Sequence, residues 1–158
     1  MVTLTVKELK QIAPYATQAN AVKYVPLLNA CFEKYGINTP LRVAHFLAQV
    51  LHESGSLKYC EEIASGADYE GRKSLGNVMP GDGKKFKGRG LIQLTGRANY
   101  TAYGKYIGED LTKSPEKVAG ELAVDVAGWF WSTRKLNELA DKDDLHNITK
   151  RVNGGLWF

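Results

Sequence analysis

The segment from Thr39 to Gly55 constrains the fold more than any other part of this chain of 158 residues. Thr39 is a good helix N-cap, Pro40 suits the first helical position, and no helix-breaking residue follows until Ser54-Gly55. Apolar side chains between these limits cover nearly the whole circumference of the helix. A helix that is apolar all round is usually a central, buried one. We therefore predict a mainly helical protein arranged around helix 41–53.

Capping signals and helical spacing recur on both sides of this segment. Before it, we predict a short helix that opens with the capping-box spacing of Thr5 and Glu8 and is limited by Pro14, and a helix through residues 22–32 that ends at Gly36. After it, we predict a helix that Thr95 caps and that runs to about Tyr106, and a helix from Ser114-Pro115 to about Arg134. A last helix is expected from about Asp144 to Val152, where Asn153-Gly154-Gly155 stops it. Seven of the sixteen glycines fall in residues 65–90, which predicts loops with a short hairpin. Residues 91–94 are expected to form a brief extended piece.

The composition is that of an ordinary globular domain, with 44% apolar and 24% charged residues. We expect residues 1–158 to form a single domain, because the chain is too short for two independent cores. Glu8 and Lys10 interrupt the first residues, so no signal peptide is expected, and no stretch approaches the roughly 18 apolar residues of a membrane span. Cys31 and Cys60 are expected to be reduced packing residues.

Glu53 is the first candidate for chemistry. It lies in the last turn of the most apolar helix, where partial desolvation and the negative end of the helix dipole both favour the protonated carboxyl. A raised pKa is what a general acid needs at neutral pH. The alternative is a solvated Glu at a frayed helix end.

Glu61 and Glu62 are candidates for a second carboxylate, just beyond the turn at Gly55. Inverting hydrolysis of a glycoside needs an acid and a base roughly 6.5–9.5 Å apart, with a water beside the base. The alternative is an exposed acidic pair. Gln93 and Thr95 share a face if their segment is extended, and could hold a water or a sugar hydroxyl there.

Metal and nucleotide chemistry find little support. His45 and His52 stand two turns apart on one helix, and no phosphate-binding loop is present, so we expect no metal site and no cofactor. Three tryptophans are candidates for stacking on a sugar, but Trp129 and Trp131 are expected in the core, which leaves Trp157.

Taken together, these segments resemble the family 19 glycoside hydrolases, the lysozyme-like chitinases, and most closely the phage and bacterial endolysins of that family. Four stretches carry the resemblance: residues 46–55 with the pair His52-Glu53, residues 87–100 (Lys-Gly-Arg-Gly-Leu-Ile-Gln-Leu-Thr-Gly-Arg-Ala-Asn-Tyr), Glu62 followed at seven residues by Tyr69, and residues 151–155 with Asn153-Gly154-Gly155. It covers about residues 20–155.

The resemblance implies a lysozyme-like fold of two helical lobes with a substrate cleft between them. It implies that Glu53 protonates the glycosidic oxygen, Glu62 activates the water and Thr95 helps to position that water. The residues it implies for sugar binding are His52, Tyr69, Gln93, Asn99 and Asn153. Members of the family usually continue past Asn-Gly-Gly with a helix that carries an arginine near the catalytic centre; here Arg151 is a candidate for that charge.

The endolysin-like form of the signature and the lack of a disulfide framework favour bacterial peptidoglycan over chitin as the substrate. The implied role is that of a monomeric phage endolysin without a separate wall-binding domain. It would remain in the host cytoplasm until a separate holin lets it reach the wall. A chitinase, a catalytically silent wall-binding module and a nucleic-acid binder are the alternatives, although no nucleic-acid motif is present.

The formal charge of +4 is unevenly distributed along the sequence. Residues 71–97 contain seven Lys and Arg residues against Asp82 alone. We expect this positive segment to border the active site and to attract an anionic polymer.

Overall fold

The computed structural model describes residues 2–157, with side chains for residues 2–154. Its helices are α1 (Val6–Ile12), α2 (Gln18–Lys34), α3 (Pro40–Glu53), η1 (Ala67–Tyr69), η2 (Lys73–Leu75), α4 (Asp82–Lys85), α5 (Arg97–Ile107), η3 (Pro115–Ala119), α6 (Asp125–Thr133), α7 (Leu136–Asp141) and α8 (Leu145–Trp157), where η marks a 3-10 helix. Pairing of extended backbone within residues 2–157 is limited to two isolated antiparallel bridges, Glu61 to Arg89 and Arg89 to Leu94. The mainly helical architecture is confirmed.

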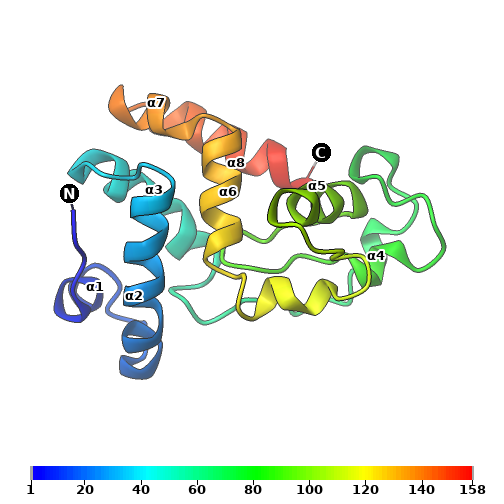
Figure 1. Ribbon diagram of the computed structural model, residues 1–158, viewed down its shortest axis with the longest axis horizontal. Helices are drawn as coiled ribbons and strands as arrows, with labels where there is room; N and C mark the ends of the chain where they lie inside the picture. The colour runs from blue at the N-terminus through cyan, green and yellow to red at the C-terminus, as the bar shows by residue number, and fades with distance from the viewer. Residues whose placement is uncertain (1, 158) are drawn as a thin grey trace.

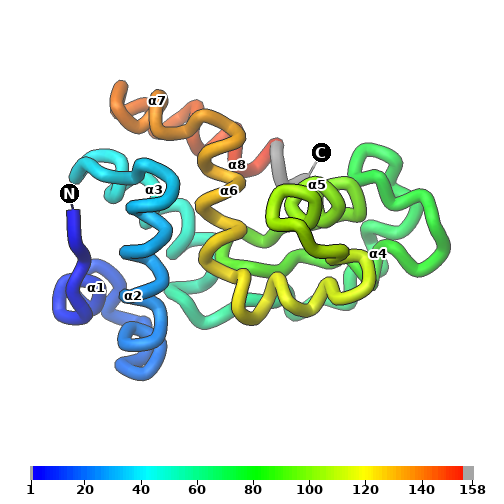
Figure 2. Tube along the Cα trace, viewed as in Figure 1, coloured from blue at the N-terminus to red at the C-terminus, as the bar shows by residue number. Residues whose placement is uncertain are grey.

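Two groups of elements lie on either side of α6 (Figure 1). One group holds α1, α2, α3 and α7, and the other holds α4, α5 and the long loops. The loops occupy most of the chain between α3 and α5, drawn in teal and green at the side away from the N-terminus (Figure 2). Asp125, the first residue of α6, connects both groups, because it accepts hydrogen bonds from Lys34 and Tyr35 at the end of α2 and from Tyr103 of α5, at 2.7–2.9 Å.

Helix α3 begins as its sequence predicts. The Thr39 hydroxyl accepts a hydrogen bond from the Arg42 backbone N–H at 3.2 Å, and Pro40 occupies the first turn. Phe46 is fully buried, with its ring edge-on to Phe32 of α2 and to Trp131 of α6 at centroid distances of 5.9 and 5.3 Å. The core positions of Trp129 and Trp131 are confirmed.

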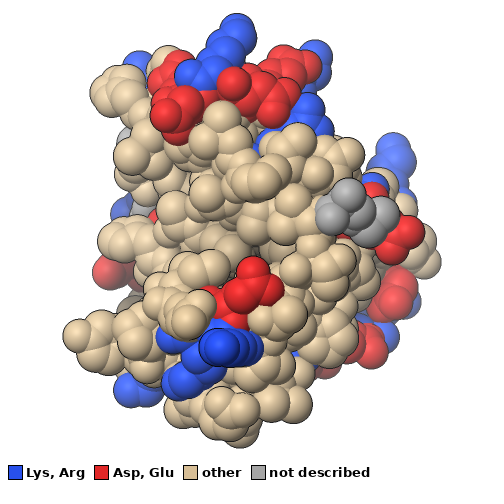
Figure 3. All heavy atoms as spheres, turned by 90° about the vertical axis from the view of Figure 1, so that its left-hand side faces the viewer, with Lys and Arg blue, Asp and Glu red and all other residues tan. Residues whose placement is uncertain are grey.

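The prediction that α3 is buried on every side is wrong. Leu41, Ala44 and Ala48 are exposed. Ala44 and Ala48 belong to one wall of an apolar hollow whose other wall comes from the N-terminal residues and α1. On this side of the molecule uncharged side chains cover most of the surface, and charged side chains gather at the top, along the right-hand edge and in one cluster of the lower half (Figure 3). Two alanines make this strip small, so leaving it uncovered costs little apolar burial.

Helix boundaries differ from the sequence-based expectation in three further places. Residues 114–134 form two elements, because the chain turns at Gly120 between η3 and α6. Residues 91–93 form a turn and not an extended piece, so the hairpin lies at 89–94 instead of within 65–90. Helix α8 continues through Asn153-Gly154-Gly155 to Trp157, so the expected turn there is wrong; the side chains of the last four residues, Trp157 included, lie outside those described. Helix α7 was not predicted.

Candidate active site

Glu53 is the last residue of α3, and the chain reverses immediately after it. Three successive residues, Gly55, Ser56 and Leu57, adopt left-handed backbone angles, with φ of 57°, 60° and 69°. Such angles are strained for residues other than glycine and persist only where the surroundings hold them. Here the Ser54 hydroxyl accepts from the Leu57 N–H at 3.0 Å, and Asn20 of α2 donates to the Leu57 carbonyl at 3.0 Å. The candidate acid therefore stands on a fixed helix end.

The environment of Glu53 matches the expectation for a general acid. Partial burial raises the pKa of its carboxyl, and the neighbouring His52 offsets only part of that rise. His52 itself is exposed. A carboxyl that keeps its proton to a higher pH is suited to donate it at near-neutral pH.

Glu62 is held by a short stretch of antiparallel pairing. The Glu62 N–H donates to the Gly88 carbonyl at 2.9 Å, and the Gly90 N–H donates to the Cys60 carbonyl at 2.7 Å. These bonds flank the bridge between Glu61 and Arg89. The candidate base thus lies on paired backbone, which fixes its direction.

Both carboxylate oxygens of Glu62 accept hydrogen bonds. The Gly88 N–H donates to Oε1 at 2.6 Å, and the Tyr69 hydroxyl donates to Oε2 at 3.1 Å. Glu62 and Tyr69 also line a small hollow formed with the residues between them. The two residues, spaced seven apart in the sequence, are thus in direct side-chain contact.

Glu61 is engaged in ion pairs instead. Lys87 lies 2.8 Å from its carboxylate and Arg89 lies 3.6 Å from it. The hydrogen bond from Lys87 lowers the pKa of the Glu61 carboxyl, and Arg89 adds to that effect. The structure thus gives the two neighbouring carboxylates different surroundings.

Gln93 and Thr95 come together through the turn and not through a shared strand face. Gln93 has a left-handed φ of 58°, and its side-chain N–H donates to the Gly90 carbonyl at 3.1 Å. The Thr95 hydroxyl donates to the Gln93 carbonyl at 2.9 Å. The prediction that Thr95 caps α5 is wrong, because Gly96 is the N-cap residue and makes no side-chain cap.

Gly88 is a site residue that the sequence analysis did not single out. A Cβ at this position would lie 3.0 Å from the Gln93 side-chain oxygen and 3.3 Å from the Thr95 hydroxyl. Gly88 also donates to Glu62, so Gln93, Thr95 and Glu62 meet around a backbone that carries no side chain. The sequence signal that could have identified Gly88 is the pair of glycines that flank Arg89 in residues 87–100.

Asn99 is half-buried in the first turn of α5, and its side-chain N–H donates to the Thr95 carbonyl at 2.8 Å. It therefore borders the same turn as Gln93 and Thr95.

Asn153 approaches the site along α8. Three side-chain contacts join α3 to the chain from the end of α7 into α8: Arg42 with Asp141, His45 with Asp143, and Gln49 with Thr149. The residue numbers rise together on both segments, so the two run in the same direction. One helical turn beyond the last contact stand Glu53 on α3 and Asn153 on α8. The helical repeat therefore predicts, from the contact of Gln49 with Thr149, that Asn153 faces Glu53 from within α8.

Arg151 does not supply a charge to the carboxylates in the described contacts. Its guanidinium donates to the backbone carbonyl of Arg134, at the end of α6, at 3.0 Å. Arg134 is partly buried over the Phe130 ring at 3.9 Å, and this burial lowers the pKa of its guanidinium.

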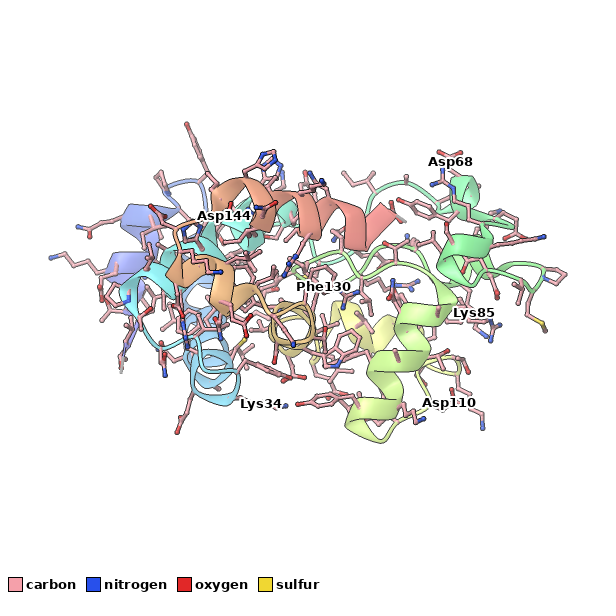
Figure 4. The ribbon with its side chains drawn as sticks, turned by 90° about the horizontal axis from the view of Figure 1, so that it is seen from above. Lys34, Asp68, Lys85, Asp110, Phe130 and Asp144 are labelled. Carbon is pink, nitrogen blue, oxygen red and sulfur yellow. The ribbon has the colours of Figure 1, made fainter. Side chains whose placement is uncertain are left out.

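The positive segment 71–97 is less positive in three dimensions than along the sequence. Lys87 and Arg89 are paired with Glu61, and Arg97 makes a close ion pair with Asp82 at 2.8 Å. The remaining cations are Arg72, Lys73, Lys84 and Lys85. Figure 4 shows Asp68 and Lys85 on the loop side, with Phe130 near the centre of the molecule and Asp144 on the other side.

Residues 2–157 contain no helix that is both long and apolar enough to cross a bilayer. Nor do the described side chains bring three or more His, Cys, Asp or Glu residues together in a way that could hold a metal ion.

Comparisons with known proteins point to one family. The family model described as chitinase class I matches residues 31–152, which is more than half of the chain. A glycosyl hydrolase family 19 domain-containing protein of Haemophilus influenzae is 36% identical over 171 residues, covering 87% of this chain and 83% of that protein. An endochitinase of Arabidopsis thaliana is 41% identical over 115 residues, covering 72% of this chain but only 39% of its own length.

The fold agrees with this assignment. The crystal structure of chitinase C from Streptomyces griseus superposes with a TM-score of 0.73 at 22% identity, covering 98% of this chain and 67% of that one. At this identity the likeness concerns the fold alone. The matched family model and the bacterial relative show that this chain belongs to glycoside hydrolase family 19.

Proposed function

We propose that this chain hydrolyses the β-1,4 glycosidic bonds of bacterial peptidoglycan, between N-acetylmuramic acid and N-acetylglucosamine, by inverting acid/base catalysis. The observation that carries the proposal is the contrast between two carboxyl groups. Glu53 has its pKa raised by burial, whereas Glu62 is held by two hydrogen-bond donors beside Gln93 and Thr95. Carboxyl groups in unlike surroundings can act as acid and base.

Glu53 is the general acid in this proposal. Its protonated carboxyl donates a proton to the glycosidic oxygen as the bond from that oxygen to the anomeric carbon breaks. The leaving sugar then departs as a neutral alcohol. A positioned acid or base of this kind contributes about 10²- to 10⁴-fold to the rate.

Glu62 is the general base, and Thr95 orients the water that attacks the anomeric carbon. The Thr95 hydroxyl donates its only hydrogen to the Gln93 carbonyl, so it can bind a water only as a hydrogen-bond acceptor. One water proton then points to Thr95 and the other to Glu62, which leaves a lone pair for the anomeric carbon. Glu62 takes the second proton as the new bond forms, and inversion follows because acid and water act on opposite sides of the sugar.

Tyr69, Gln93, Asn99, His52 and Asn153 are proposed to bind the sugar around these groups. Their side chains supply hydroxyl, amide and imidazole groups, which suit the hydroxyl and N-acetyl groups of the polymer.

The proposal is tested on purified bacterial walls and on chitin. Glu53→Gln should abolish the release of reducing ends, a loss of at least about 10²-fold, while the protein still sediments with insoluble walls. Glu62→Gln should cause a similar loss. Glu61→Gln is the matched control, since it changes the neighbouring carboxylate and should retain most of the activity. NMR of the first product should show the inverted anomer.

Full lysis by Glu53→Gln would instead indicate that the acid is another residue, and wall binding without hydrolysis by the unaltered chain would indicate a binding module. Binding to duplex DNA at near-physiological salt would favour a nucleic-acid partner.

Chitin hydrolysis is the second candidate, because the Arabidopsis relative is called an endochitinase and the Streptomyces structure a chitinase. Cleavage of chitin with no loss of wall turbidity would replace the peptidoglycan proposal by this one. For the lytic role we propose that the enzyme acts as a monomer on the wall of the cell that produced it, after a separate pore-forming holin has released it from the cytoplasm.

A further inference from the structure

Asn77 lies at the end of a chain of hydrogen bonds that leads to Glu62. It belongs to the loop after η2 and is completely buried. Its side-chain N–H donates to the Tyr69 carbonyl at 2.9 Å, and its side-chain oxygen accepts from the Arg97 backbone N–H at 2.9 Å. A buried amide with both ends satisfied has a fixed orientation.

The Arg97 N–H is one of the first N–H groups of α5, which have no partner inside the helix. Gly96 caps α5 without a side chain, so Asn77 provides from a distant loop the acceptor that a local N-cap side chain would ordinarily provide. The amide therefore connects the start of α5 to the backbone of η1.

The loop itself is pressed onto the start of α5. A Cβ on Gly76 would lie 2.7 Å from that of Ala98, and a Cβ on Gly96 would lie 2.6 Å from the Leu75 carbonyl oxygen. The buried Asp82 accepts from the Arg97 guanidinium at 2.8 and 2.9 Å. These contacts hold the loop that carries Asn77 against the start of α5, and none of them involves Tyr69.

Tyr69 is anchored at both of its ends. Its carbonyl accepts from Asn77 at 2.9 Å and, more weakly, from the Arg72 N–H at 3.3 Å. Its hydroxyl donates to Glu62. The position of the backbone of Tyr69 thus decides where its hydroxyl meets the carboxylate.

We propose that Asn77 is a positioning residue that, through Tyr69, sets the orientation of the Glu62 carboxylate against the start of α5. This inference rests on the proposed function, since the carboxylate it orients is the proposed base. Small displacements of reacting groups of about 1 Å can reduce rates by as much as 10²-fold, so a residue without substrate contact can matter for the rate.

Asn77→Ser is the first variant. A serine hydroxyl is too short to bridge the Tyr69 carbonyl and the Arg97 N–H together. We expect kcat on bacterial walls to fall about ten-fold with KM changed less than about two-fold. Arg97→Lys is the matched control, because it weakens the ion pair with Asp82 in the same contact and keeps the backbone N–H that Asn77 binds. It should lower the melting temperature without a comparable loss of kcat.

A double-mutant cycle with Tyr69→Phe separates positioning from general destabilisation. Once the Tyr69 hydroxyl is absent, Asn77→Ser should reduce kcat no more than about two-fold further, whereas its effect on melting temperature should persist. Equal losses of kcat from Asn77→Ser in both backgrounds would overturn the proposal.

A spectroscopic readout does not depend on activity. Burial, and then the charge and hydrogen bond of Glu62, raise the pKa of Tyr69 to about 12. If Asn77 holds Tyr69 against Glu62, the Asn77→Ser phenol should ionise at lower pH in ¹³C NMR, with Tyr69→Phe giving the assignment. An unchanged Tyr69 titration overturns the inference even if no glycosidase activity is found. Inactivity of the unaltered chain on both walls and chitin would by itself refute only the proposed function.

Discussion

At the scale of single residues, the carboxyl of Glu53 lies in surroundings that disfavour its charged form. Its pKa is raised by burial, so the folded protein binds that proton more tightly than the unfolded chain, whose glutamates titrate near about 4.3. The contribution of Glu53 to the free energy of unfolding therefore falls as pH rises from the unfolded to the folded pKa. Above the folded pKa, the contribution of Glu53 to the free energy of unfolding stays at this lower value.

Glu53→Gln should therefore raise the melting temperature at pH 7 and leave it nearly unchanged well below pH 4, when Glu53 is protonated in both states. Calorimetry across this pH range measures the difference. A destabilised Glu53→Gln protein at pH 7 would mean that the ionised carboxylate is stabilised by its surroundings.

Gly88 is the second residue whose role can be tested directly. Its backbone is not in the left-handed region, so alanine is tolerated by the backbone, but the added methyl group would press against Gln93 and Thr95. We expect Gly88→Ala to remain folded and to lose at least ten-fold in activity, because the methyl group displaces the proposed water. Gly71→Ala, in open space, is a control for the presence of an extra methyl group in this loop region, although its own φ of 71° adds local strain. Undiminished hydrolysis by Gly88→Ala would show that the attacking water does not lie beside Gly88.

At the scale of elements, the alignment of α3 with α8 rests on a hydrogen bond between Gln49 and Thr149, and it predicts where Asn153 lies relative to Glu53. Gln49 of α3 is buried, and its side-chain N–H donates to the Thr149 hydroxyl at 3.1 Å, one turn before each of the two site residues. Removing both polar groups together keeps the packing and avoids an unsatisfied partner.

The double variant Gln49→Met with Thr149→Val should therefore fold with a stability within about 1.5 kcal/mol of the unaltered protein. Its KM for walls should rise if the register of α8 presents Asn153 to the sugar. Steady-state kinetics and denaturant unfolding measure the two effects. An unchanged KM would show that Asn153 does not depend on this contact.

Several elements were predictable because their signals are local. The Thr5-to-Glu8 capping box and the Thr39-Pro40 start of α3 are formed as predicted, since neighbours in the sequence supply every partner. The start of α5 was not predictable in this way. Its N–H donor finds an acceptor on Asn77, twenty residues away, and Thr95 turns to the Gln93 carbonyl instead.

At the scale of the whole molecule, the charge distribution differs from its distribution along the sequence. Lys84 lies near Glu70, and the Glu70 carboxylate is bound by the Gly81 and Gly83 N–H groups, which lower its pKa. Lys85 acts on Asp82 and Asp110 in the same way as a minor influence. In the folded chain, acidic side chains thus lie near the Lys and Arg residues of the positive segment 71–97, which are clustered in the sequence.

Attraction of an anionic wall should consequently be modest. Lysis should weaken as ionic strength rises, because charges more than about 8–10 Å apart are screened at physiological salt. Neutralising Lys84 and Lys85 should reduce that salt dependence without altering kcat, whereas neutralising Lys7 and Lys23, exposed on α1 and α2, should not. Turbidity assays at graded salt concentrations decide this, and a salt dependence identical in all variants would exclude the loop as the source of attraction.

The sequence by itself determined the helical class, the capped start of α3, the family resemblance and the candidate residues from Glu53 to Asn153, because these depend on periodicity, local caps and short specific motifs. Tertiary structure alone decided which partner each candidate has. Glu61 and Glu62 are adjacent in the sequence, yet one meets Lys87 and the other Gly88 and Tyr69. The physical reason is that hydrogen bonds and ion pairs depend on distances across the fold, and residues 60–62 meet residues 88–90 only after the long loop has closed against α5.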